Sequence, residues 1–430
     1  MPEAVLCFDT KSGFDTKSRQ KRHLLRQSLT RRRCYPSRGS HSHWFPFGDR
    51  LLESSLPAGT SIADRYPILL LVHALGPGGT ERQVAEIAKN LNPERFEVHV
   101  GAVLTTGMRA TELGAAGIPI LELPVRSLYG PSTVRGIRLL RSYLKAHRIR
   151  VVHTFDAPFN AFAAPVARFS GTPVVLTSQR CYRDLISPKY HPLLRFSHRI
   201  ADAVVANCEA MRTHLQSDYG VPDRKIRVLY NGLDASVFHA GGRRRMPQLQ
   251  NDELVIGSVG LLRPEKCLNL LVQAFAEVHR RHARARLVLV GSGEELPRLR
   301  AQAAALGLGD ACLFAPAAAN VVPWLRSIDI FVLPSRSEAL SNSLLEAMAC
   351  GCCPVASRVG GNPELVIPGE TGLLFESGDA GGLARALETL ISNPELRLRL
   401  AARAVAASAG FSVAAAVQRA EQIYLEFCSR

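Results

Sequence analysis

The most informative stretch of the chain is Glu338-Ala-Leu-Ser-Asn-Ser-Leu-Leu-Glu346, in which two carboxylates stand eight residues apart. The apolar segment before it, 329–335, is typical of a buried strand. The segment after it is helical as far as Gly351, a residue type that commonly ends helices. A strand that leads into a helix through a short polar loop places the free N–H groups of the helix at the carboxyl edge of a sheet, where phosphates bind. We therefore expect Glu338 to lie in a crevice at that edge and Glu346 to face it from the helix.

Both carboxylates also have an ordinary interpretation. Ser343-Leu-Leu-Glu346 fits a capping box, in which Glu346 would only satisfy backbone N–H groups at the start of the helix. Glu338 could equally be a solvated loop residue. The stretch alone leaves these alternatives open, and the neighbouring segments have to decide between them.

Apolar strands alternate with amphipathic helices from Tyr66 onward. In the first half, strand patterns occur at 68–73, 96–104, 118–121, 151–154, 174–177, 203–206 and 226–230. After a polar break at 241–247 the pattern restarts, with strands at 255–261, 287–290, 312–314, 330–333 and 355–357. Such alternation indicates βαβ units and parallel sheets. We expect two Rossmann-like α/β domains, 66–248 and 249–408, with a ligand-binding cleft between the carboxyl edges of their sheets.

Residues 1–65 differ from the rest of the chain. The segment Phe8-Asp-Thr-Lys-Ser12 is repeated at 14–18, and residues 1–50 carry eleven Lys and Arg against four Asp and Glu. We expect a basic, disordered N-terminal extension here.

The net charge of +16 favours an anionic partner. Nucleic acid is the obvious candidate, but no DNA- or RNA-binding motif occurs and aromatic residues make up only 7% of the chain. An anionic lipid surface or an anionic lipid-linked substrate fits the scattered basic excess better.

Membrane insertion and secretion are not expected. The longest stretch without Asp, Glu, Lys or Arg is 311–325, whose 15 residues include two prolines and are too few to span a bilayer. The N-terminus has no continuous apolar segment of the kind that a secretory signal needs. Ten cysteines are scattered without the spacing of a disulfide framework or a zinc site. These features predict a cytoplasmic protein with reduced thiols.

Three more segments follow strands and therefore point into the expected cleft: Gly78-Gly-Thr80, Arg263-Pro-Glu-Lys266 and Gly291-Ser-Gly293. Arg263 and Lys266 can neutralise a diphosphate directly. Taken alone, these two cations could also be a solvated pair on a loop. No Asp-x-Asp pair occurs to carry a magnesium ion for the same task, so we expect neither a metal nor another cofactor.

The stretch from Glu338 to Ser357 resembles the E-x7-E region of the retaining glycosyltransferases of family 4, which have the GT-B architecture of two facing Rossmann-like domains. Further segments that resemble recurring parts of that family, in its usual order, are 78–82, 230–234, 359–364 and 369–375. The resemblance covers roughly residues 66 to 410. It implies an acceptor domain at 66–248, a nucleotide-sugar donor domain at 249–408 and a C-terminal helix at 409–430 that crosses back to the first domain.

The resemblance also implies roles for the residues of the donor side. Glu338 would contact the hydroxyl groups of the donor sugar near the reacting carbon, and Glu346 would bind the ribose hydroxyl groups. Lys266 and Arg263 would bind the diphosphate and its developing charge. The family usually reads Gly-Arg-Leu where this chain has Gly260-Leu-Leu262, so the arginine stands in a shifted place here. The other residues expected at the donor are Ser341, Asn342, Gly291 and Gly293.

On the acceptor side the resemblance implies Gly78, Gly79 and His153. The family often has a histidine at the position of Phe155, and that histidine is the one credited with contacting the sugar. His153 could therefore be a packed residue at the end of a strand instead of a catalytic one.

The helix expected at 133–148 carries a basic stripe beside its apolar face, formed by Arg138, Arg141, Lys145 and Arg148. The stripe fits docking on an anionic membrane near a lipid-linked acceptor. It fits equally well a Rossmann helix with a solvated outer face, and the sequence leaves both interpretations open.

Taken together, these features predict a metal-independent retaining hexosyltransferase that uses a nucleotide-sugar and a saccharide or lipid-linked acceptor. We expect it in the cytoplasm, with a peripheral contact to the inner face of the plasma membrane as an open alternative, and without a nucleic-acid partner. Two other functions stay open: a nucleotide-sugar epimerase or hydrolase on the same fold, and a non-catalytic GT-B scaffold. Release of nucleotide that depends on an acceptor separates transfer from the first, and turnover itself separates it from the second.

Overall fold

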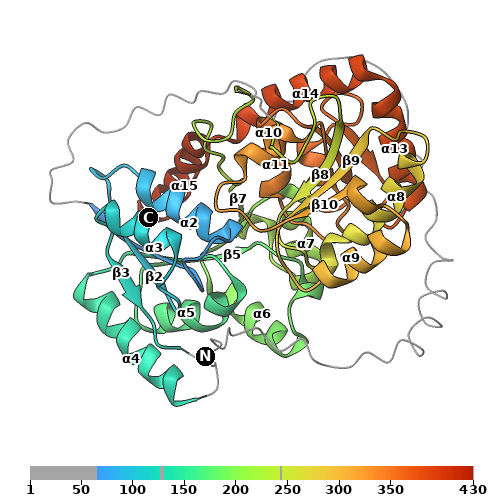
Figure 1. Cartoon of the computed structure of the whole chain (residues 1–430). Coiled ribbons are helices and arrows are strands. Elements are labelled where there is room, and N and C mark those ends of the chain that lie inside the picture. The colour runs from blue at the N-terminus through green and yellow to red at the C-terminus, as the bar shows by residue number, and fades with distance from the viewer. Residues whose placement is uncertain (1–64, 126–129, 243–244, 430) are drawn as a thin grey trace, which may run out of the picture. The chain divides into compact units, whose positions relative to one another are not determined.

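The computed structural model describes residues 65–125, 130–242 and 245–429, which form two parallel β-sheets covered by helices (Figure 1). All of these residues belong to one contact unit, Ser61–Arg430. Apart from Arg65, the N-terminal extension expected at 1–65 lies outside the described residues.

The first sheet has the strand order β3-β2-β1-β4-β5-β6-β7. Its strands are β1 (Tyr66–Leu71), β2 (Phe96–Ala102), β3 (Ile120–Glu122), β4 (Val151–Thr154), β5 (Val174–Gln179), β6 (Ala203–Ala206) and β7 (Ile226–Val228). Its helices are α2 (Gly79–Asn90), α3 (Met108–Ala115), α4 (Pro131–Ala146), α5 (Ala157–Phe169), α6 (His191–Ile200) and α7 (Glu209–Tyr219). The strand order reverses between β1 and β4, and in open parallel sheets a ligand crevice forms at such a point.

The second sheet has the order β10-β9-β8-β11-β12-β13. Its strands are β8 (Leu254–Val259), β9 (Ala285–Val290), β10 (Cys312–Ala315), β11 (Ile330–Leu333), β12 (Cys353–Ser357) and β13 (Leu373–Phe375). The helices that follow in the chain are α8 (Leu268–His279), α9 (Leu296–Ala305), α10 (Val322–Ser327), α11 (Asn342–Ala349), α12 (Asn362–Leu365), α13 (Ala380–Ser392), α14 (Pro394–Ser408) and α15 (Val413–Cys428). The predicted fold class, two Rossmann-like α/β sheets, is confirmed.

The central strands are apolar along their whole length because helices cover both faces of each sheet. Residues 68–71 of β1, for example, are completely buried. The last helix, α15, packs against α2 beside the first sheet (Figure 1). Its Tyr424 is fully buried in the same apolar cluster as Ile68. The end of the chain therefore stabilises the sheet formed by its first half.

The three clustered cysteines Cys350, Cys352 and Cys353 are buried free thiols, and burial raises the pKa of Cys350 to about 11. Within the described ranges, no helix combines the length and the apolar character that crossing a bilayer requires.

Candidate active site

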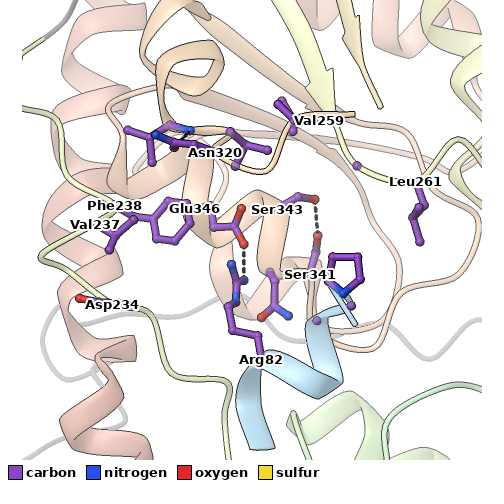
Figure 2. Close-up of a pocket in the computed structure, with 18 of the residues that line it drawn as sticks. Arg82, Asp234, Val237, Phe238, Val259, Leu261, Asn320, Ser341, Ser343 and Glu346 are labelled. Carbon is purple, nitrogen blue, oxygen red and sulfur yellow. Dashed lines mark hydrogen bonds and ion pairs between the residues drawn. The ribbon is translucent and has the colours of Figure 1, made fainter. Parts of the chain in front are cut away.

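A pocket of about 960 Å³ lies between the two sheets and is lined from both (Figure 2). The first sheet contributes the start of α2 and the segment 234–239. The second sheet contributes the loop after β8, the loop 338–341 that follows β11, and the first turns of α11. These loops and helix starts follow the carboxyl ends of parallel strands, where ligands bind in open α/β sheets.

Lys266 and Glu338 meet in this pocket because β8 and β11 are neighbouring parallel strands, so that the loops after them lie side by side. The ammonium nitrogen of Lys266 lies 2.5 Å from Oε1 of Glu338. The same oxygen accepts a hydrogen bond of 2.6 Å from the hydroxyl of Ser335. The Glu338 side chain is only 9% exposed, so it is not the solvated loop residue of the ordinary interpretation.

Glu346 lies on α11 and forms an ion pair with Arg82 of α2, across the gap between the two sheets (Figure 2). The side chain of Glu346 is 8% exposed. The capping-box interpretation is wrong, because α11 is capped by Ser341, whose hydroxyl accepts from the backbone N–H of Leu344 at 3.3 Å. Glu346 is therefore directed at the pocket and not at the helix start.

Arg82 had no role in the sequence analysis. Besides pairing with Glu346, its guanidinium lies over the ring of Phe238, 5.4 Å from the ring centroid (Figure 2). The signal that could have found it is its place in the first turn of the helix that follows the Gly78-Gly79 turn. Its partner could not have been read from the sequence, because 264 residues separate the two side chains.

Arg263 also lines the pocket, but its side chain is held only loosely. It is 57% exposed, and the carboxylate nearest to it is that of Glu265, at 3.9 Å. Arg263 is thus free to turn toward an anion in the pocket, whereas Lys266 is already fixed by Glu338.

Gly291 and Gly293 do not line the pocket. Both have positive φ angles, 149° and 159°, and both press against the loop after β8. A Cβ on Gly291 would lie 1.9 Å from the carbonyl oxygen of Gly260, and one on Gly293 would lie 2.3 Å from that of Leu262. The geometry gives these glycines a different task from donor contact: they bring the turn after β9 close enough to support the loop that carries Arg263.

Gly78 and Gly79 line the pocket at the start of α2. A Cβ on Gly79 would lie 2.4 Å from the side-chain nitrogen of Asn342, so the absence of a side chain lets α2 and α11 approach each other. Asn342 in turn accepts a hydrogen bond of 2.8 Å from Asn231. Ser341 and Asn342, predicted at the donor, both line the pocket.

His153 does not line the pocket and is fully buried in β4. Its Nδ1 lies 2.9 Å from the hydroxyl of Tyr424, and its Nε2 lies 2.8 Å from that of Ser178. Burial lowers the pKa of His153 to about 3. Its surroundings are those of a packed strand residue, which argues against a contact with the acceptor.

A further charged cluster follows the carboxyl ends of β1, β4 and β5. Asp156 accepts hydrogen bonds from the backbone N–H groups of His73 at 2.5 Å and Phe159 at 3.0 Å, and burial raises its pKa to about 6. Arg180 donates to Asn231, and burial lowers its pKa to about 10. Burial also raises the pKa of Glu81, whose carboxylate lies over Gly78: a Cβ there would be 2.1 Å from Oε2.

The arrangement combines cations, buried carboxylates and the free N–H groups at the start of α11 around one pocket. Cations and helix N-termini bind phosphate groups, and carboxylates accept hydrogen bonds from sugar hydroxyl groups. Among the described residues, no three His, Cys, Asp or Glu side chains converge as a metal ion would require.

Two family models match the chain, one for each sheet. The model described as "Glycosyltransferase Family 4" matches residues 77–237, and "Glycosyl transferases group 1" matches residues 243–406.

Curated relatives match over about half of their length. A D-inositol 3-phosphate glycosyltransferase of Acidothermus cellulolyticus is 38% identical over 221 residues, which is 48% of this chain and 49% of that protein. An N-acetyl-alpha-D-glucosaminyl L-malate synthase of Bacillus anthracis is 32% identical over 225 residues, 50% of this chain and 57% of the relative. The chain thus spans about half the length of the curated relatives that it matches.

Solved structures match over most of the chain. The Anabaena protein Alr3699/HepE in complex with UDP-glucose aligns with a TM-score of 0.70 at 25% identity, covering 83% of this chain and 99% of that one. The sucrose-phosphate synthase of Thermosynechococcus elongatus aligns with a TM-score of 0.74 at 20% identity, covering 85% and 100%. At the latter identity the likeness supports the fold alone.

Proposed function

We propose that this chain, which belongs to the retaining GT-B glycosyltransferases of family 4, moves a hexosyl group from a nucleotide-sugar to a hydroxyl group of an acceptor. The observation that carries the proposal is that the pairs Lys266–Glu338 and Arg82–Glu346 face one pocket between the carboxyl edges of two parallel sheets. This arrangement supplies positive charge for a diphosphate and carboxylates for hydroxyl groups in a single site.

In our proposal the diphosphate of the donor binds at the N-terminus of α11. Its negative charge is met there by the free backbone N–H groups of the helix and by Lys266, and the loosely held Arg263 turns toward it. Glu346 accepts hydrogen bonds from the ribose, which replaces Arg82 as its partner. Glu338 accepts from a hydroxyl group of the sugar and keeps the ammonium of Lys266 beside the leaving oxygen.

The reaction that follows needs electrostatic stabilisation more than acid–base chemistry from the protein. The bond between the anomeric carbon and the phosphate oxygen breaks, the acceptor oxygen bonds to that carbon on the same face, and the departing phosphate takes the hydroxyl proton. Negative charge grows on the phosphate, and Lys266 with the α11 amides lies ready to meet it. One such preorganised group is typically worth ~10²–10³ in rate.

The acceptor, a saccharide or a lipid-linked saccharide, binds in this proposal on the side of the first sheet. Glu81 and Arg180 take the place that the sequence analysis gave to His153. Both belong to the charged cluster next to Gly78, and a carboxylate and a guanidinium there can orient a hydroxyl group and an anionic group of the acceptor. The relatives named for D-inositol 3-phosphate and L-malate indicate that small hydroxylated anions belong in the acceptor panel of any assay.

Acceptor-dependent release of nucleoside diphosphate tests the proposal. The protein is incubated with UDP-glucose, UDP-N-acetylglucosamine or GDP-mannose, with and without the acceptor panel, and the released nucleotide is measured. We expect one donor to be consumed rapidly only when an acceptor is present, with a new glycoside of retained configuration. Equal release without any acceptor would favour a hydrolase or epimerase, and no release from any donor would favour a scaffold.

We also propose that α4 gives the protein a peripheral contact with the anionic inner face of the plasma membrane. The segment 131–150 contains no Asp or Glu. The helix exposes basic side chains together with two apolar ones, Val134 at 49% and Leu139 at 38% exposure. The exposed basic residues are Arg135, Arg138, Arg141 and Lys145. Cations around apolar side chains suit an anionic lipid surface.

Sedimentation with lipid vesicles tests this contact. Binding to vesicles with anionic lipid is expected to exceed binding to neutral vesicles and to fall on raising the salt concentration. Arg138→Glu should weaken it, whereas Arg298→Glu, at an exposed position on α9, should weaken it less. Equal binding to neutral and anionic vesicles, or none to either, contradicts the contact.

A further inference from the structure

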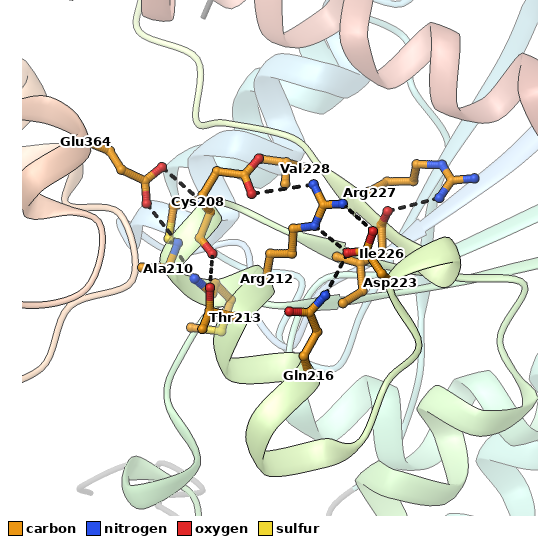
Figure 3. A network of polar contacts seen from close by, with 12 residues as sticks. Cys208, Ala210, Arg212, Thr213, Gln216, Asp223, Ile226, Arg227, Val228 and Glu364 are labelled. Carbon is orange, nitrogen blue, oxygen red and sulfur yellow. Dashed lines mark hydrogen bonds and ion pairs between the residues drawn. The ribbon is translucent and has the colours of Figure 1, made fainter. Parts of the chain in front are cut away.

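Glu364 of α12, beside the second sheet, reaches across to helix α7 of the first sheet (Figure 3). Its carboxylate accepts hydrogen bonds from the backbone N–H of Glu209 at 3.0 Å and of Ala210 at 2.9 Å. It also accepts one of 2.8 Å from the hydroxyl of Tyr230. All three donors lie more than 130 residues before Glu364 in the chain.

The first N–H groups of a helix have no partner within the helix, and the N-terminus carries partial positive charge. A carboxylate at this place therefore makes charge-assisted hydrogen bonds, which are stronger than neutral ones. At the same helix, Arg212 forms two hydrogen bonds of 2.7 Å with Asp223, which precedes β7 (Figure 3). Helix α7 is thus tied to its own sheet by Arg212 and to the second sheet by Glu364.

The N-terminus of α7 also contacts the loop that carries Glu338. The thiol of Cys208, the residue that caps α7, donates to the carbonyl oxygen of Ala339 at 3.4 Å. That oxygen also accepts the backbone N–H of Gly361 at 2.7 Å. The residue next to Glu338 is therefore held between the first sheet and the segment that leads to Glu364.

The packing of this segment leaves no slack. A Cβ on Gly360, whose φ is +50°, would lie 1.6 Å from the carbonyl oxygen of Glu338. A Cβ on Gly361 would lie 2.4 Å from the oxygen of Ala339. A shift of the segment 360–364 would therefore move the backbone on which the Glu338 carboxylate stands.

We propose that Glu364 is a positioning residue for sugar transfer: by docking on the N-terminus of α7 it fixes the segment 360–364, and with it the loop that carries Glu338, in the arrangement that faces the donor. The proposal rests on the function proposed above, since it assigns Glu338 to the donor sugar. Glu364 itself would touch neither substrate.

The test variant is Glu364→Gln, which keeps the size of the side chain but removes its charge and one of its two acceptor oxygens. Glu370→Gln is the matched control, because it makes the same charge change at an exposed position six residues further on. We expect Glu364→Gln to lower kcat at least tenfold while the Kd for the nucleoside diphosphate changes less than twofold, since Lys266, Glu346 and α11 are untouched. The control should match the parent protein in both.

Amide hydrogen exchange gives a second readout that needs no activity. In Glu364→Gln the peptide that covers residues 338–342 should exchange at least tenfold faster than in the parent protein, and in Glu370→Gln it should not. Tyr230→Phe, which removes one of the three hydrogen bonds and leaves the charge, should give a smaller change of the same kind.

Three results would overturn the proposal: a kcat for Glu364→Gln within twofold of the parent, an unchanged exchange rate at 338–342, or a loss of nucleotide affinity as large as the loss of kcat. The last would mean general damage to the donor site. If the parent protein turns over no donor, the proposed function fails, and the exchange of the 338–342 peptide alone decides whether Glu364 positions the loop.

Discussion

The ammonium nitrogen of Lys266 lies 2.5 Å from Oε1 of Glu338, although 72 residues separate them in the chain. The contact follows from the order of the second sheet, in which β8 and β11 are neighbours. It places a cation and a nearly buried carboxylate side by side in the pocket, where an anionic leaving group and a sugar hydroxyl group would need them.

Replacing Lys266 by alanine should lower kcat by about 10²–10³, because the growing charge on the leaving phosphate loses a preorganised partner. Steady-state transfer kinetics measure this loss. Arg284→Ala is the control: Arg284 is 81% exposed and pairs with Asp252 only at the surface, so it should leave kcat within twofold. Equal rates for Lys266→Ala and the parent protein would remove Lys266 from the reaction.

Replacing Glu346 by alanine should weaken binding of the nucleoside diphosphate about tenfold to a hundredfold, since hydrogen bonds to a charged group are worth about 1.5–3 kcal/mol. Arg82→Ala should not weaken binding, because in our proposal the ribose displaces Arg82 from Glu346. Calorimetric titration measures both variants. If Arg82→Ala weakens binding as strongly as Glu346→Ala does, then Arg82 itself contacts the nucleotide.

Replacing Gly79 by alanine should lower kcat/KM at least tenfold. The added Cβ would lie 2.4 Å from the nitrogen of Asn342, which cannot swing away freely because Asn231 holds its oxygen. Gly114→Ala on α3 is the matched control, since nothing lies within 4 Å of a Cβ there. The control should keep full activity and gain roughly 0.5–1 kcal/mol of stability from the helix preference for alanine. Unchanged activity in Gly79→Ala would show that the approach of α2 to α11 is not needed.

The stability of the fold should depend on pH through buried His198. Burial lowers its pKa from 6.5 to about 3, and its Nε2 has no hydrogen-bond partner among the described residues. Between these values the unfolded chain binds the proton and the folded chain does not. The stability contribution is therefore complete above pH 6.5 and is lost as the pH falls toward 3.

His198→Gln isolates this term. The difference in the free energy of unfolding between pH 7.5 and pH 5 should be smaller in the variant by about 2 kcal/mol, since pH 5 lies 1.5 units below 6.5. Buried His153 acts in the same direction and Asp156 in the opposite one, but both are present in the two proteins and cancel in the comparison. Chemical denaturation at the two pH values gives the difference, and an equal difference in both proteins contradicts the prediction.

The two-sheet fold could be predicted because strands buried on both faces are apolar throughout, and the helices between them show one apolar face. Elements without such a pattern escaped prediction. β13 is an edge strand of three residues, Leu373–Phe375, and α14 (Pro394–Ser408) alternates arginine with leucine and alanine so that no single face stands out.

The site could be predicted in its residues but not in its partners. Glu338, Glu346 and Lys266 follow strands, so that the carboxyl-edge rule brings them to the pocket. The pairing of Glu346 with Arg82 depends on how the two sheets pack, which no local pattern encodes. A glycine turn such as Gly291-Ser-Gly293 also reads the same whether its backbone approaches a ligand or, as here, another loop.

A crystal structure with the nucleoside diphosphate of the active donor tests the central claim most directly. We predict phosphate oxygens within hydrogen-bond distance of Lys266 and of the first N–H groups of α11, and a ribose hydroxyl group on the carboxylate of Glu346 in place of Arg82. A nucleotide bound outside the pocket between the sheets, or one that leaves Lys266 and Glu346 untouched, would contradict the account.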